Sequence, residues 1–154
     1  ASGKIVSAFD IASVLAIGAD WANSARGFMF AIGCIQSQSC HTNKCPTGVA
    51  TQDALRQRAL VVPDKAQRVF NFHRSTLKAL AEMLAAAGLE HPSQLSAKHL
   101  VRRMSATEIK LFSQLHVFLK PGELLTGEEN GEFYSRMWQM ARADSFEPNE
   151  SAAA

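Results

Sequence analysis

Three cysteines are the residues of this 154-residue chain whose type and spacing point most directly to chemistry. Cys34, Cys40 and Cys45 fall within twelve positions, in the spacing C-x5-C-x4-C. An odd number of cysteines cannot form a closed set of disulfides, so the trio favours a reducing compartment. Structural zinc sites bring their ligands in close pairs, and this spacing fits zinc poorly. Three thiolates suit a [3Fe-4S] cluster, whereas a [4Fe-4S] cluster would need a fourth ligand from water, His41 or elsewhere. The competing interpretation is three free thiols with no metal.

The residues before the cysteines have the alternating helix and strand order of an α/β fold. A capping box predicts a helix that begins after Ser7, and Gly18 ends it. Residues 19–25 predict a short buried strand, and 26–32 predict a short helix that leads into the cysteine segment.

The residues after the cysteines predict helices only. The longest runs from Asp64 to Gly88 and carries His73 on its apolar face, where a structural role is favoured over a catalytic one. We expect further helices over 93–103, 105–119 and 131–143.

The composition is that of an ordinary globular protein, with 47% hydrophobic and 19% charged residues. A net charge of +2 and the lack of a basic stripe argue against a nucleic-acid partner. There is no apolar run of membrane-spanning length and no signal peptide, so we expect a cytoplasmic protein, with an upstream membrane anchor left open. The chain begins without methionine, on a turn, and we expect it to be a piece of a longer protein.

The cysteine segment with its neighbours resembles the iron–sulfur segment of glutamate synthase. The matching residues are Gly33-Cys34-Ile35, Cys40-His41, Cys45-Pro46 and Gly48-Val49-Ala50-Thr51-Gln52. The family pattern is close to G-C-[IV]-x4-C-H-x3-C-P-x-G-[IV]-A-T-Q. The resemblance implies that Cys34, Cys40 and Cys45 ligate a [3Fe-4S] cluster in an FMN-binding domain.

The resemblance also implies a fold, the C-terminal part of a TIM (β/α)8 barrel from the end of its seventh strand onward. Such barrels bind phosphate with the loops after strands seven and eight. Here these loops would supply Ser2 and Gly3, then Ala25 and Arg26, to the FMN phosphate. Without the resemblance, Ser2-Gly3 is merely a turn and Arg26 a solvated helix residue. Many related flavin barrels carry Gly-Arg or Gly-Thr where this chain has Ser24-Ala25-Arg26.

The resemblance divides the chain into three parts. Residues 1–60 would end the barrel and carry the cluster segment, 61–104 would be a helical region packed on the barrel, and 105–154 a helical tail. A complete barrel needs about 250 residues, so these residues cannot close one and we expect the chain alone to fold poorly.

The function that the resemblance implies is FMN- and [3Fe-4S]-dependent reductive amination of 2-oxoglutarate to glutamate. Its partners would be ferredoxin or an NAD(P)H-oxidising flavin subunit as electron donor, and ammonia or glutamine as nitrogen source. The oligomeric state stays open, with a homo-oligomer as one expectation, and no catalytic residue is assigned. One alternative is a related flavoprotein acting on another amine, as in N-methylglutamate formation. The other is a non-enzymatic iron–sulfur module for electron transfer or sensing.

Overall fold

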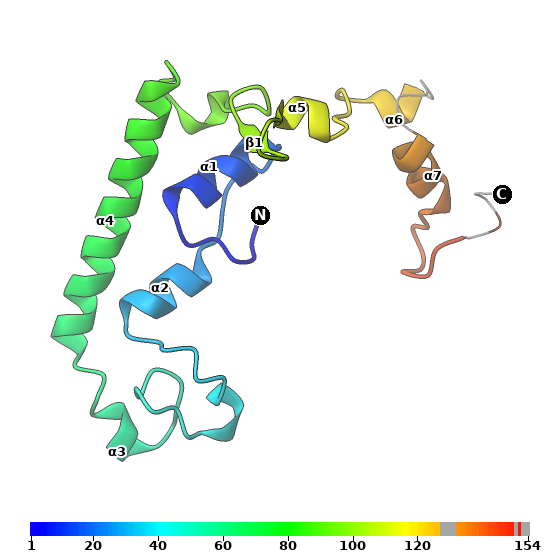
Figure 1. Cartoon of the computed structure of the whole chain (residues 1–154). Helices are drawn as coiled ribbons and strands as arrows, with labels where there is room; N and C mark the ends of the chain where they lie inside the picture. Colours follow the sequence, from blue (N-terminus) through cyan, green and yellow to red (C-terminus); the bar gives the residue numbers. More distant parts are fainter. Residues whose placement is uncertain (127–131, 150, 152–154) are drawn as a thin grey trace.

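The computed structural model describes residues 1–126, 132–149 and 151 (Figure 1). The helices are α1 (Ala8–Ala16), α2 (Ala25–Ala31), α3 (Ala54–Gln57), α4 (Val62–Ala86), α5 (Phe112–Leu115), α6 (Glu123–Thr126) and α7 (Glu132–Met140). The other described elements are the 3-10 turns η1 (Cys40–Thr42) and η2 (Pro92–Gln94) and the strands β1 (Val101–Arg103) and β2 (Ile109–Leu111).

Helix α1 begins with the predicted capping box. The hydroxyl of Ser7 accepts a hydrogen bond from the Asp10 backbone N–H at 3.2 Å, and the Asp10 carboxylate accepts one from the Ser7 N–H at 2.8 Å. Two N–H groups that the first turn of a helix leaves without a partner are thereby satisfied.

Helix α4 is the long helix predicted from Asp64, and it begins two residues earlier, with Pro63 in its first turn. Its end is a Schellman motif, in which the Leu89 N–H donates to the Leu84 carbonyl at 2.9 Å and the Gly88 N–H donates to the Ala85 carbonyl at 3.0 Å. Gly88 has φ +72°, a left-handed conformation that glycine adopts at little cost.

The core lies where α1 and α2 pack along one side of α4 (Figure 1). Ala8 and Ala12 of α1 are buried against Leu80 and Leu84 of α4, and the small alanines let the two helices approach closely. Farther along α4, the Phe28 ring of α2 contacts the Phe72 ring edge to face, with centroids 5.2 Å apart. The His73 ring also lies against Phe28, at 5.8 Å.

The helices predicted over 93–103 and 105–119 are wrong in most of their extent, and the only helical elements in these two described ranges are η2 and the four-residue α5. Between them lies a short antiparallel hairpin, with Val101 opposite Leu111 and Arg103 opposite Ile109. The chain turns at 104–108, where the Met104 N–H donates to the Glu108 carbonyl at 2.9 Å. β-Branched residues favour strands, and the capping-box residues at 105–108 serve this turn instead of a helix. The regions 61–104 and 105–154 are therefore not wholly helical.

The strand predicted over 19–25 is also wrong in its extent. What forms there is a single parallel bridge between Ser2 and Asn23. The predicted helices over 26–32 and 131–143 correspond to α2 and α7, and residue 131 lies outside the described residues. Within the described part of the chain, no helix combines the length and apolar character needed to cross a bilayer.

Candidate functional site

The cysteine segment follows α2 and folds beside α3, at the end of α2 away from α1 (Figure 1). Cys34 is half-buried, and its N–H donates to the Met29 carbonyl at 2.9 Å. Cys40 begins η1 and is exposed, whereas Cys45 is only 6% exposed. Among residues 1–126, 132–149 and 151, no three His, Cys, Asp or Glu side chains form a group that could hold a metal ion. The structure thus places the three cysteines in one segment without bringing their thiols together as a ligand set.

The thiol of Cys45 lies in a pocket of hydrogen-bond donors. The Thr47 hydroxyl is 3.5 Å from the Cys45 Sγ. The pKa of the Cys45 thiol is lowered to about 7, most strongly by this hydroxyl and then by the backbone N–H groups of Ala50, Thr47 and Val49. Burial of the thiol raises the pKa, by less than these donors together lower it. Donors directed at a sulfur stabilise its thiolate, which is the form that binds metals. The surroundings of the Cys45 thiol therefore favour its thiolate form.

Among the non-glycine residues that the structure describes, left-handed backbone conformations are confined to the two segments predicted to bind cofactors. Four non-glycine residues of the described chain have positive φ: Lys4 at 56°, Gln36 at 57°, Gln38 at 58° and Asn43 at 63°. Such conformations cost about 1–2 kcal/mol each for residues with a Cβ, and they gather at functional sites. These four positions are therefore candidates for a functional site.

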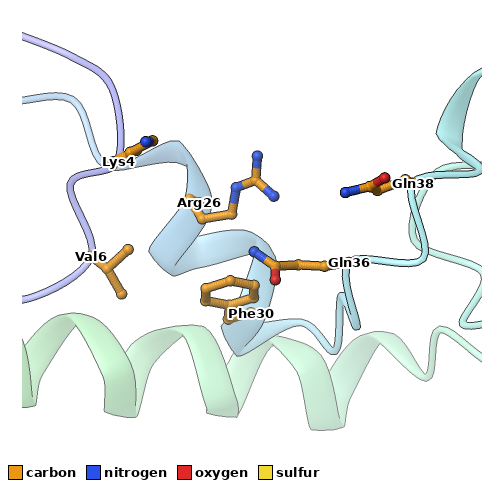
Figure 2. A pocket seen from close by; sticks show the side chains of 6 residues that line it. All are labelled: Lys4, Val6, Arg26, Phe30, Gln36 and Gln38. Carbon is orange, nitrogen blue, oxygen red and sulfur yellow. The ribbon is translucent and has the colours of Figure 1, made fainter.

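Three of these strained residues face one pocket of about 390 Å³. Figure 2 shows its lining: Lys4, Val6, Arg26, Phe30, Gln36 and Gln38. The Arg26 and Gln38 side chains extend toward each other across it, and the Phe30 ring lies on one side (Figure 2). Two cationic groups and two amides around a partly apolar space suit an anion attached to an organic group.

The other residues predicted to bind phosphate are Ser2 and Gly3 in the first loop and Ala25 in the second, and these two loops lie next to each other. The parallel bridge from Ser2 to Asn23 sets the first loop beside the second, and the Ser24 hydroxyl donates to the Ile5 carbonyl at 2.8 Å. Gly3 has φ +100°, and Ala25 is the first residue of α2. The structure thus brings the two predicted loops together, with Arg26 on the pocket.

Sequence reasoning missed several residues of this site. Lys4, Gln36 and Gln38 line the pocket. Of these, only Lys4 carried a signal in the sequence, because it directly follows the predicted Gly3. The amides around Cys45 were also missed, because residue types do not report where a backbone N–H points.

The residues fit the implied cofactors in their chemistry. Three thiols, one of them surrounded by N–H donors, are a donor set typical of iron–sulfur ligation. The positive charges of Lys4 and Arg26 suit a phosphate ester.

Comparisons with known proteins agree on one family. The family described as "Conserved region in glutamate synthase" matches residues 1–90. The glutamate synthase large subunit-like protein YerD of Bacillus subtilis is 44% identical over 120 residues, which cover 77% of this chain and 23% of YerD. The archaeal-type glutamate synthase [NADPH] of Dehalococcoides mccartyi is 31% identical over 113 residues, covering 71% of this chain and 23% of that protein.

A third relative, ferredoxin-dependent glutamate synthase 2 of Synechocystis, is 35% identical over 91 residues, covering 58% of this chain and 6% of that protein. The chain thus spans less than a quarter of the length of these relatives. No solved structure matches. The family match covers more than half of the chain and includes both the cysteine segment and the two loops predicted to bind phosphate, so this chain belongs to the glutamate synthase family.

Proposed function

We propose that the protein is a glutamate synthase-like oxidoreductase that depends on FMN and a [3Fe-4S] cluster. The observation that carries the proposal is the pocket in which Lys4 and Arg26, from the predicted phosphate loops, meet Gln36 and Gln38, from the cysteine segment. A flavin phosphate in this pocket would contact the same segment that holds the cysteines. The phosphate end of the flavin and the cysteine segment would then be neighbours.

Each predicted site residue has a role in this proposal. Cys34, Cys40 and Cys45 would hold the cluster, with Cys45 already surrounded by donors. The phosphate would be bound by Arg26 and Lys4, which line the pocket, and by their sequence neighbours Ser2, Gly3 and Ala25, which are not among its lining residues. When bound, the cluster supplies single-electron transfer and FMN supplies hydride transfer, while the protein sets their orientation and electrostatics.

We also propose that residues 1–32 end a (β/α)8 barrel. The parallel bridge between Ser2 and Asn23, with α1 between the bridged segments, supports this proposal. Neighbouring barrel strands are parallel and joined by a helix.

The substrates would be 2-oxoglutarate with ammonia or glutamine. Relatives named as ferredoxin-dependent and as NADPH enzymes support ferredoxin or an NAD(P)H-oxidising flavin subunit as the electron donor.

The proposal is tested by EPR of the protein at its full natural length, purified and reconstituted with iron and sulfide without oxygen. We expect the spin-half signal of an oxidised [3Fe-4S] centre, and its loss in Cys40→Ser but not in the control Ser37→Ala. Glutamate formation from 2-oxoglutarate and ammonia or glutamine, with a chemical reductant, tests the enzyme activity. A wild-type protein without this signal, or a signal that survives Cys40→Ser, would contradict the cluster. A cluster without flavin or glutamate formation would favour a non-enzymatic electron-transfer module.

A further inference from the structure

We propose that Asn43 is a positioning residue for Cys45, because its side chain ties together the two ends of the loop that presents this cysteine. The inference rests on the proposed function in that Cys45 is taken as a cluster ligand. Its structural basis is a set of hydrogen bonds, here called the Asn43 clamp, made by Asn43, Thr51 and Gln52. These residues lie on either side of Cys45, and two of them belong to the Thr51-Gln52 end of the family segment.

The Asn43 side chain reaches across nine positions of sequence. Its Oδ1 accepts a hydrogen bond from the Gln52 N–H at 2.6 Å. The Thr51 hydroxyl lies 2.9 Å from the same Oδ1 and 2.7 Å from the Asn43 carbonyl oxygen, so it donates to this pair of acceptors. One side-chain oxygen thus holds both residues that follow the loop.

Thr51 connects the clamp to α3. Its hydroxyl accepts from the Asp53 N–H at 3.1 Å, and its carbonyl accepts from the Gln57 Nε2 at 2.8 Å. Asp53 in turn is the N-cap of α3, with its carboxylate accepting from the Leu55 N–H at 2.8 Å. The loop is therefore fastened to a helix and not only closed on itself.

Asparagine combines two properties that this position needs. Its φ of 63° is left-handed, a conformation in which Asn and Asp are enriched and most side chains are strained. Its side chain is also short and carries an acceptor oxygen. Glycine would keep the backbone conformation and remove the acceptor, and aspartate would keep both. The two substitutions therefore separate backbone shape from side-chain bonding.

The clamp matters for Cys45 because the donors around its thiol come from the clamped loop. The N–H groups of Thr47, Val49 and Ala50 all lie between Asn43 and Thr51. If the ends of the loop separate, Cys45 and the Thr47 hydroxyl, which lies 3.5 Å from its sulfur, lose their fixed placement. Groups that orient metal ligands act in this way in other sites, where losing them weakens metal binding about 10- to 100-fold.

The test compares Asn43→Gly, Asn43→Asp and Thr51→Val in the protein at its full natural length. Thr76→Val is the matched control, because the Thr76 hydroxyl donates at 2.8 Å to the Phe72 carbonyl inside α4, away from the loop. Hydrogen exchange over 43–57 is measured in iron-free protein, and the [3Fe-4S] EPR signal per polypeptide is measured after reconstitution.

We expect Asn43→Gly and Thr51→Val to speed exchange at 43–57 about tenfold or more and to reduce the EPR signal severalfold. Asn43→Asp and Thr76→Val should behave like the wild type in both measurements. Unchanged exchange in Asn43→Gly would overturn the clamp, as would equal losses in Asn43→Asp and Asn43→Gly. Faster exchange with undiminished cluster content would overturn the positioning role. A wild-type protein without a cluster would refute the proposed function and, with it, the positioning of a ligand, while the exchange data would still decide whether the clamp exists.

Discussion

Gly48 is the residue at which a single methyl group should disrupt the loop around Cys45. It has φ +75°, and a Cβ at this position would collide with the Arg56 carbonyl oxygen and lie 3.1 Å from the Arg56 carbonyl carbon. The obstacle is backbone, which cannot rotate away as a side chain could. Gly88 provides the matched control, since it has nearly the same φ, +72°, with no atom within 4 Å of its Cβ.

The expected cost of each substitution follows from these two geometries. An alanine in the left-handed region costs about 1–2 kcal/mol, and about 0.4–1 kcal/mol is recovered because alanine restricts the unfolded chain. Gly88→Ala should therefore destabilise by about 1 kcal/mol. Gly48→Ala carries the same cost plus about 1–3 kcal/mol for the overlap with Arg56. We expect it to destabilise by about 2–4 kcal/mol.

The assay is urea unfolding of both variants in the protein at its full natural length, with hydrogen exchange over 43–57. Exchange is needed because a loop can open without global unfolding. Gly48→Ala should accelerate exchange in this loop, and Gly88→Ala should not. Equal destabilisation by the two substitutions, with exchange over 43–57 unchanged, would refute the argument that the Arg56 carbonyl blocks a side chain.

Three further predictions concern the helices and the pocket. The pKa of the Asp10 carboxyl is lowered, chiefly by its hydrogen bond from the Ser7 N–H. The ionised carboxylate therefore stabilises the fold at pH values above the pKa of this carboxyl in the unfolded chain, and the stabilisation is lost as pH falls below about 4. Urea unfolding at pH 6 should show Asp10→Asn less stable than wild type by about 0.3–1 kcal/mol, and the difference should disappear near pH 2. Gly27→Ala would place a Cβ 2.7 Å from the Phe72 ring and should destabilise by about 1–3 kcal/mol, with Phe72→Leu recovering part of the loss in a double-mutant cycle followed by urea unfolding. Arg26→Gln should weaken FMN binding about tenfold or more in a flavin-fluorescence titration, and riboflavin binding much less, because riboflavin lacks the phosphate.

Each of these predictions has an outcome that would contradict it. A stability difference for Asp10→Asn that stays constant from pH 6 to pH 2 would show that its charge has no part in the effect. Additive losses in the Gly27 and Phe72 cycle would mean that the two residues do not meet. Equal loss of FMN and riboflavin affinity in Arg26→Gln would place Arg26 away from the phosphate.

Helix boundaries set by neighbouring residues could be predicted from the sequence. The capping box of Ser7 and Asp10 closes within one turn of α1. Helix α4 ends through a bond from Gly88 to the carbonyl three positions earlier and a bond from Leu89 to the carbonyl five positions earlier. The hairpin was missed for the opposite reason. Its pairing of Val101 with Leu111 joins residues ten positions apart, and the residue types at 105–108 satisfy a capping box equally well. Local pattern alone does not choose between these states.

The site was predictable in its residue types and not in its geometry. Cysteine spacing and the family pattern selected Cys34, Cys40 and Cys45, and the order of elements placed Arg26 at the start of α2. The donors around the Cys45 sulfur depend instead on the backbone angles of the loop, which the side chain of Asn43 fixes from outside it. The arrangement of the cysteine thiols likewise depends on the conformation of the whole segment, which their spacing does not determine.

The distribution of strain explains why this loop needs a clamp. The buried core lies between α1 and the C-terminal half of α4, around Ala12 and Leu84, whereas the left-handed residues Gln36, Gln38 and Asn43 lie in the cysteine segment beyond α2. Packing in this core therefore cannot offset the conformational cost of the three left-handed residues in the cysteine segment. Local hydrogen bonds do so at Asn43, whose clamp satisfies two donors with one side-chain oxygen. At Gln36 and Gln38 the side chains instead face the pocket, so a ligand there would offset strain that the free chain retains. Since any ligand that binds only the folded state stabilises it, an anion bound in this pocket beside Arg26 would also stabilise the part of the cysteine segment that lines it.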